Sequence, residues 1–158
     1  MINDVHLRVI GPLDAVAAGT NPTGEEILDT AVSADTIDLQ VARDIGEGAN
    51  LYAVFTVTTA VTRAAGACTV TFEVITSASA DLSAPTVIAS SDAIPKATLV
   101  AGYQHVLRVP PSVGGTGQRY LGLQMTFSAA ADTGEWLGDF VHDIQDGKKF
   151  YSSGFAVS

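Results

Sequence analysis

The sequence predicts an all-β fold: a jelly roll or antiparallel β-sandwich of about eight strands. Short runs rich in Val, Thr, Ile, Phe and Tyr alternate apolar with polar residues, which is typical of strands with one buried face. Gly, Pro, Asn, Asp and Ser separate these runs at short intervals. No long stretch shows the 3.6-residue apolar period of a helix. We therefore expect a single domain over residues 1–158.

Residues 44–76 give the strongest strand signal. The runs LYAVFTVTT and CTVTFEVIT flank a short connection that contains Gly66. We interpret them as the two strands of an antiparallel hairpin. The alternation predicts which side chains of these runs face the core: Leu51, Ala53, Phe55, Val57, Val70, Phe72 and Val74.

Six further segments have strand character, and two others do not. The expected strands are 5–10, 36–39, 86–90, 101–110, 119–128 and 135–143. Residues 11–35, the N-terminal arm, contain several Gly and Pro breakers and are predicted to be a long loop. Residues 144–158, the C-terminal tail, carry aromatic residues among Gly and Ser and are predicted to be extended.

Charge and hydropathy exclude several classes of function. The chain has 8 basic and 17 acidic residues, a net charge of −9. Since the bases are scattered, we expect no direct contact with nucleic acid. No apolar run reaches the roughly 20 residues that span a bilayer, and no signal peptide is recognisable, so we expect synthesis in a cytoplasm and no membrane contact. The single Cys68 is expected to be a small buried residue.

No motif for catalysis or metal binding stands out, so we expect no enzyme activity and no cofactor. The triplet Asp132-Thr133-Gly134 matches an aspartic protease core, but it is also a natural turn. The three histidines His6, His105 and His142 lack the spacing of a zinc site. A hydrolase whose triad assembles only in space stays an alternative. A second alternative is a carbohydrate- or receptor-binding jelly roll, with an aromatic platform from Trp136, Tyr103, Tyr120 and Tyr151.

Several segments together resemble one protein family. They are ARDIGEGANLYAVFTVTTA, PTVIASSDAIP, AGYQHVLRVP and RYLGLQMTF, followed by a closing Asp-Ile-Gln and Phe-Tyr-Ser-Ser-Gly-Phe. The chain from Thr36 to its end resembles the capsid cement, or decoration, proteins of short-tailed phages.

The resemblance implies a non-enzymatic jelly roll on the outer surface of an icosahedral capsid. Such a protein is made in the host cytoplasm and joins the virion. There it holds neighbouring subunits of the major capsid protein together and stabilises the head against the pressure of packaged DNA. It also implies a small homo-oligomer, with a dimer as the first expectation and a trimer as the alternative.

Apolar residues in the two predicted irregular segments are the expected partner-binding residues. Loops of an isolated domain have little reason to carry them, whereas strand edges and extended termini can pair with a neighbour. The alternative is that both segments fold back on their own sandwich. The predicted partner-binding residues are Ile27, Leu28, Val32, Phe150, Tyr151 and Phe155.

Overall fold

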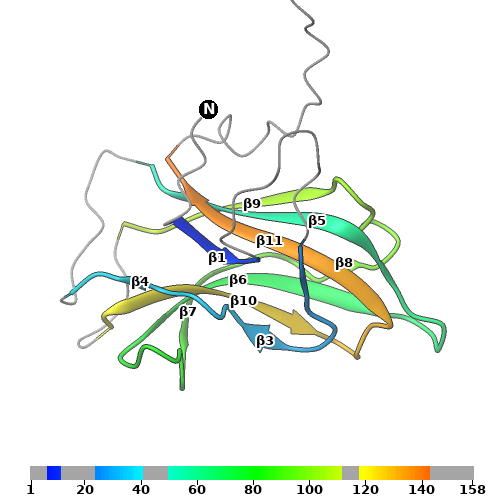
Figure 1. Ribbon diagram of the computed structural model, residues 1–158, viewed down its shortest axis with the longest axis horizontal. Coiled ribbons are helices and arrows are strands. Elements are labelled where there is room, and N and C mark those ends of the chain that lie inside the picture. The colour runs from blue at the N-terminus through cyan, green and yellow to red at the C-terminus, as the bar shows by residue number, and fades with distance from the viewer. Residues whose placement is uncertain (1–6, 12–23, 41–49, 112–117, 143–158) are drawn as a thin grey trace, which may run out of the picture.

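Two antiparallel sheets pack face to face (Figure 1). The computed structural model describes residues 7–11, 24–40, 50–111 and 118–142. Within these residues, sheet A contains β1 (Arg8–Ile10), β2 (Glu25–Glu26), β5 (Tyr52–Thr62), β9 (Gln104–Arg108) and β11 (Thr133–Val141). Sheet B contains β3 (Ala31–Val32), β4 (Ile37–Asp38), β6 (Thr69–Ser77), β7 (Thr86–Ser90), β8 (Ile94–Pro95) and β10 (Tyr120–Phe127).

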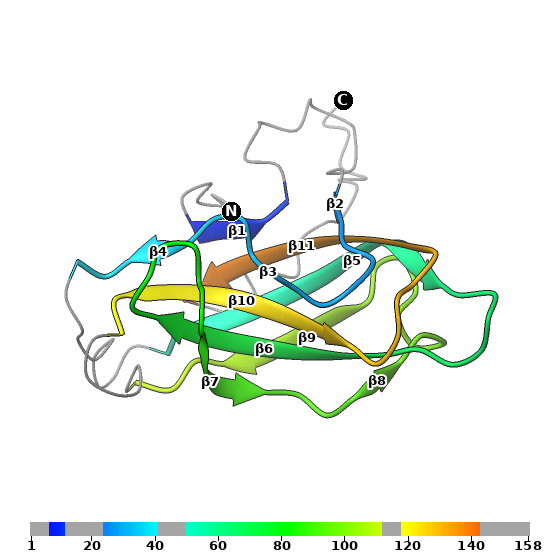
Figure 2. The same cartoon turned by 90° about the horizontal axis from the view of Figure 1, so that it is seen from below.

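The strand order is that of a jelly roll. In sheet A the order is β1-β11-β5-β9, with β2 beside β11, and in sheet B it is β3-β10-β6-β7, with β4 beside β10 and β8 beside β6. The first strand thus pairs with the last, and each strand further inward pairs with its counterpart from the other end of the chain. This nested pairing defines the double Greek key. The predicted fold class is confirmed, and Figure 2 shows β10 and β6 side by side in front of sheet A.

The two strongest strands do not form the predicted hairpin. β5 pairs with β11 and β9 in sheet A, whereas β6 pairs with β10, β7 and β8 in sheet B. The connection from Arg63 to Cys68 therefore crosses from one sheet to the other. The strand assignment and the inward faces were right and the pairing was wrong, because side-chain alternation reports which face is buried and not which strand lies alongside.

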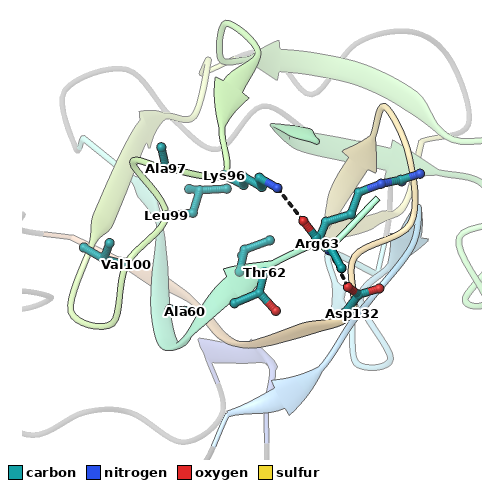
Figure 3. Close-up of a pocket in the computed structure, with 10 residues that line it drawn as sticks. Ala60, Thr62, Arg63, Lys96, Ala97, Leu99, Val100 and Asp132 are labelled. Atoms are coloured by element: carbon teal, nitrogen blue, oxygen red, sulfur yellow. Dashed lines mark hydrogen bonds between the residues drawn. The ribbon is translucent and has the colours of Figure 1, made fainter. Parts of the chain in front are cut away.

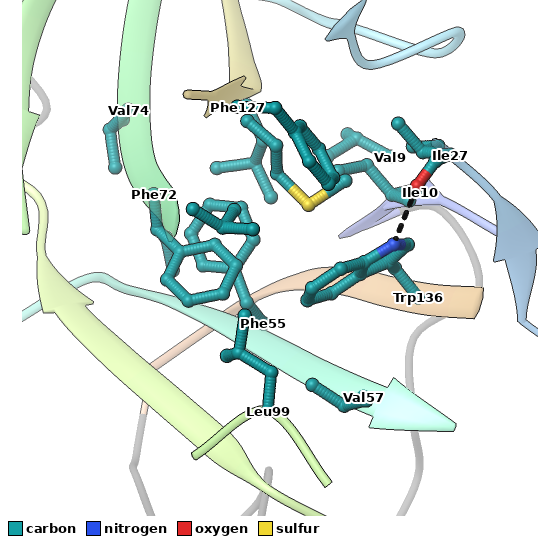
Figure 4. Packing of buried hydrophobic residues seen from close by; sticks show 14 of the residues in the cluster. Val9, Ile10, Ile27, Phe55, Val57, Phe72, Val74, Leu99, Phe127 and Trp136 are labelled. Carbon is teal, nitrogen blue, oxygen red and sulfur yellow. Dashed lines mark hydrogen bonds between the residues drawn. The ribbon is translucent and has the colours of Figure 1, made fainter. Parts of the chain in front are cut away.

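The core forms between the inward faces of the sheets (Figure 4). Phe55 of sheet A and Phe72 of sheet B meet with ring centroids 4.6 Å apart. Trp136 of β11 packs edge-on against Phe72 and Phe127. All seven residues predicted to face the core belong to it: Leu51, Ala53, Phe55, Val57, Val70, Phe72 and Val74.

The second half of the N-terminal arm is part of the sandwich. β2 pairs with β11, and β3 and β4 pair with β10, so residues 24–38 bridge the two sheets at one side. Ile27 donates its backbone N–H to the Gly134 carbonyl at 3.2 Å. The prediction of a loop over 11–35 is wrong for this part, because partners in β10 and β11 stabilise strands of two residues that local sequence cannot reveal. Residues 12–23 lie outside the described residues.

Candidate interaction surface

A depression of about 510 Å³ lies beside the crossing from β5 to β6 (Figure 3). Its charged side chains bind backbone groups. Lys96 Nζ donates to the carbonyls of Arg63 at 2.5 Å and Gly66 at 2.7 Å. Arg63 donates to the carbonyls of Ala65 and Ala130, and Asp132 accepts the backbone N–H of Ala64 at 2.6 Å. These contacts hold the connection in place, so the polar groups here have a structural role.

Asp132-Thr133-Gly134 lies where the chain runs from β10 in sheet B to β11 in sheet A. Asp132 precedes β11, and the Thr133 hydroxyl lies 2.8 Å from that of Thr62 and donates to the Ala60 carbonyl at 2.9 Å. The triplet therefore closes a connection between β10 and β11, which lie in different sheets. Like the β5–β6 connection, it is not a hairpin.

The described histidines lie in different surroundings. His105 of β9 stacks on Phe72 with ring centroids 5.2 Å apart, and its Nδ1 lies 3.5 Å from the Tyr103 hydroxyl. Burial lowers the pKa of the His105 imidazole below its usual range. His142 is exposed after β11, and His6 lies outside the described residues. Within the described residues, no three His, Cys, Asp or Glu side chains gather as metal ligands would.

The predicted aromatic platform does not exist at Trp136. Its side chain is fully buried, and the indole N–H donates to the Ile27 carbonyl at 3.0 Å. Tyr103 is half-buried against the core. Tyr120 is also half-buried, with the Arg119 guanidinium 5.1 Å from its ring centroid, and Tyr151 lies outside the described residues. Trp136 therefore fixes the bridge between the sheets.

The single thiol is internal, as predicted. Cys68 is buried, and its Sγ lies 3.0 Å from the carbonyl oxygen of Ala129. This contact links the residue before β6 to the segment that follows β10. A buried thiol that donates to a backbone carbonyl is a packing residue.

The described part of the chain contains no helix long and apolar enough to cross a membrane.

The predicted partner-binding residues that the structure describes differ in their burial. Ile27 is buried in the core, which its aliphatic side chain joins beside Trp136, so its prediction as a partner contact is wrong. Leu28 is half-buried and packs against the same core. Val32 is half-buried on β3 at the edge of sheet B. Phe150, Tyr151 and Phe155 lie outside the described residues.

A pair of strand edges is open at the opposite side of the sandwich. Among the described strands, β7 pairs with β6 and β9 pairs with β5, and each has no partner on its other side. β7 and β9 lie near each other. On β7, Val87 is one of two large apolar side chains in the described chain that are well exposed, at 47%, and the other is Val100 of the β8–β9 connection, at 53%. An unpaired edge with an exposed apolar residue can accept a strand from another chain.

The chain matches the sequence model of a protein family. The sequence model of the Bbp16 family matches residues 22–138, which is well over half of its length. The chain belongs to the Bbp16 family. The match begins just before β2 and ends within β11, so it covers the sandwich except for β1 and the end of β11. No curated protein matches the sequence.

Proposed function

We propose that this jelly roll is a capsid cement protein: a non-enzymatic virion component that binds the outside of an icosahedral phage head. It joins neighbouring subunits of the major capsid protein and so stabilises the head against the pressure of packaged DNA. The resemblance of several segments to cement proteins of short-tailed phages suggests this role. The protein is made in the host cytoplasm and acts as a small homo-oligomer, a dimer first or a trimer.

The observation in the structure that supports the proposal is the pair of open edges on β7 and β9. Cement acts through many weak contacts over a broad surface, which become strong together when each copy touches more than one neighbour. An open edge supplies such contacts through backbone N–H and C=O groups, and Val87 beside it supplies apolar area. Both edge strands are already paired on their inner side, so little ordering entropy is lost on binding.

The net charge of −9 also supports a protein partner. An acidic surface is repelled by DNA phosphates. It is attracted to a basic surface, and the attraction raises the rate of association. In this proposal the protein therefore binds capsid protein on the outer surface of the shell and does not contact the packaged DNA.

Co-sedimentation with assembled shells of the phage's major capsid protein tests the proposal. We expect the protein to sediment with assembled shells and not with unassembled capsid protein, because its site spans neighbouring subunits. Val87→Lys should weaken this binding, since lysine on an edge strand opposes strand addition. Val100→Lys is the matched control, because it places the same charge at the other exposed valine. Absence of binding to shells would overturn the proposed function.

A further inference from the structure

Part of the outward face of sheet A is buried, although such a face of a two-layer sandwich is normally polar and open to solvent. Alternation directs Val54 of β5 and Leu137, Asp139 and Val141 of β11 away from the core. Val54 is 2% exposed, Leu137 0% and Val141 7%. Apolar side chains on an open sheet face do not reach such values, so this face has a cover.

Sheet B shows what a cover within the described chain looks like. Its outward-facing Ile75 is also fully buried, and there the connection between β6 and β7 supplies Leu82, itself buried. A Cβ on Gly122 of β10 would collide with the Leu82 side chain, which shows how closely the loop lies on the sheet. The Ser77 hydroxyl donates to the Ser83 carbonyl at 2.8 Å and secures that loop.

On sheet A the described chain lies over the face at two places, Gly11 and Gly24; a Cβ on Gly24 would collide with the Thr58 hydroxyl and with the backbone of Glu135 and Trp136. A Cβ on Gly11 would lie 2.5 Å from the Leu137 side chain, so the end of β1 lies directly over Leu137. Another part, towards the end of β11, contains Val54, Asp139 and Val141. The close contacts of Gly11 and Gly24 do not include these three residues.

A buried ion pair occupies the same part of the face. Arg8 Nε of β1 donates to Asp139 Oδ1 at 2.9 Å, and the two side chains are 8% and 11% exposed. Ion pairs on an open sheet face keep most of their solvent contact. Burial raises the pKa of the Asp139 carboxyl above its usual range, and the nearby Arg8 opposes this shift. Water is therefore excluded from Asp139 as well as from its apolar neighbours.

We propose that the C-terminal tail of this same chain, residues 143–158, docks on the outward face of sheet A around Val54, Asp139 and Val141. The tail begins two residues after Val141, at the end of the face that needs a cover. At about 3.3 Å per extended residue it is long enough to run back along the whole of β11. It contains Phe150, Tyr151 and Phe155, whose rings can cover this apolar part of the face.

The docked tail has a role separate from the proposed function. The sequence predicts Phe150, Tyr151 and Phe155 as contacts to a partner protein. Docking on sheet A gives them a partner within their own domain. The open edges of β7 and β9 lie on the other sides of their sheets from β1 and β3 and remain available to the capsid. The proposal stands whether or not the protein binds a shell.

Hydroxyl-radical footprinting of the full chain tests the cover directly. In the unmodified protein Val54 and Val141 should oxidise slowly. In the variant Phe150→Ser/Tyr151→Ser/Phe155→Ser their oxidation should rise several-fold, while buried Trp136 and Phe72 stay protected and show that the sandwich is intact. The matched control is Leu13→Ser/Val16→Ser, which changes apolar residues outside the tail, and it should leave these rates unchanged. Unchanged rates in the tail variant, or a rise in the control alone, would overturn the proposal.

Photo-crosslinking keeps the test decisive if the tail variant unfolds. A benzophenone amino acid replaces Tyr151 in the otherwise unmodified chain, and the cross-linked peptides are located by mass spectrometry. The proposal expects links within one chain to β5 or β11 of sheet A, in equal yield when the protein is diluted. Links only between two copies would overturn it in favour of an exchanged tail. Links to sheet B, or none, would also overturn it.

Discussion

Arg8 and Asp139 are 131 positions apart in the sequence, and they form a buried ion pair at 2.9 Å on the outward face of sheet A. The pair connects the first strand of the jelly roll to the last. Because both charges have lost most of their water, removing either one would leave the other buried and uncompensated. The stability of β1 and β11 therefore depends on the segment that excludes water from this face.

Removing one member of this pair should be costly. Arg8→Met leaves a buried Asp139 carboxylate without its guanidinium, and we expect a loss of about 3–5 kcal/mol in the free energy of unfolding, measured with urea. The double variant Arg8→Met/Asp139→Leu should lose much less, because no buried charge is left alone. A single variant as stable as the unmodified protein would show that the pair is open to water.

The two rings at the centre of the core should be coupled. Phe55→Ala or Phe72→Ala should each cost about 3–5 kcal/mol of unfolding free energy. Because the rings touch across the two sheets, the double variant should lose less than the two single losses combined, with a coupling of about 0.5–1.5 kcal/mol. A loss below about 1 kcal/mol for either single variant would contradict the burial of these rings.

The sequence predicted this core but not the pairing around it. Alternation in 51–59 and 68–76 identified Phe55 and Phe72 as inward residues, and their burial confirms that. A hairpin between two such runs is the simplest arrangement of neighbours in sequence. The structure instead pairs β5 with β11 and β6 with β10, and contacts between distant strands leave no periodic signal in either one.

The bridge between the sheets shows a second limit. β2 and β3 are each two residues long, and they exist because β11 and β10 offer hydrogen-bonding edges at those positions. The Gly and Pro residues around them predicted a loop. The burial of Ile27, and the Trp136 N–H that reaches its carbonyl, depend on this pairing between distant segments. The ion pair of Arg8 with Asp139 was likewise not predictable from either residue alone.

Stability should fall as the pH is lowered through the range of histidine titration. The pKa of His105 is lowered in the folded protein by burial, so below about pH 6.5 the unfolded chain binds a proton that the folded chain resists. The unfolding free energy should therefore decrease as the pH falls from 7 to 5. The raised pKa of Asp139 has the opposite sign, since it favours the folded state as the pH falls towards acid.

The variant His105→Gln separates these contributions. Its unfolding free energy should depend less on pH between 7 and 5 than that of the unmodified protein, because Asp139 titrates in both. His142→Gln, at an exposed position, is the matched control and should keep the original pH dependence. A His105→Gln profile parallel to that of the unmodified protein would contradict the burial of the imidazole.

Association with the proposed capsid partner should depend on salt. A chain of net charge −9 is steered to a basic surface by long-range attraction. The Debye length falls from about 30 Å at 0.01 M salt to about 10 Å at 0.1 M, so the association rate should fall steeply over that range. The dissociation rate should change less. Stopped-flow measurement of both rates checks this, and association rates independent of salt would exclude steering.

Electron microscopy of capsids assembled with and without this protein tests the central claim most directly. A cement protein predicts extra density on the outer surface, at the boundaries between capsid subunits, with a jelly roll whose β7 and β9 side faces the shell. Particles without the protein should lack this density and release their DNA more readily under heat. Identical maps with and without the protein, or density inside the shell, would contradict the account.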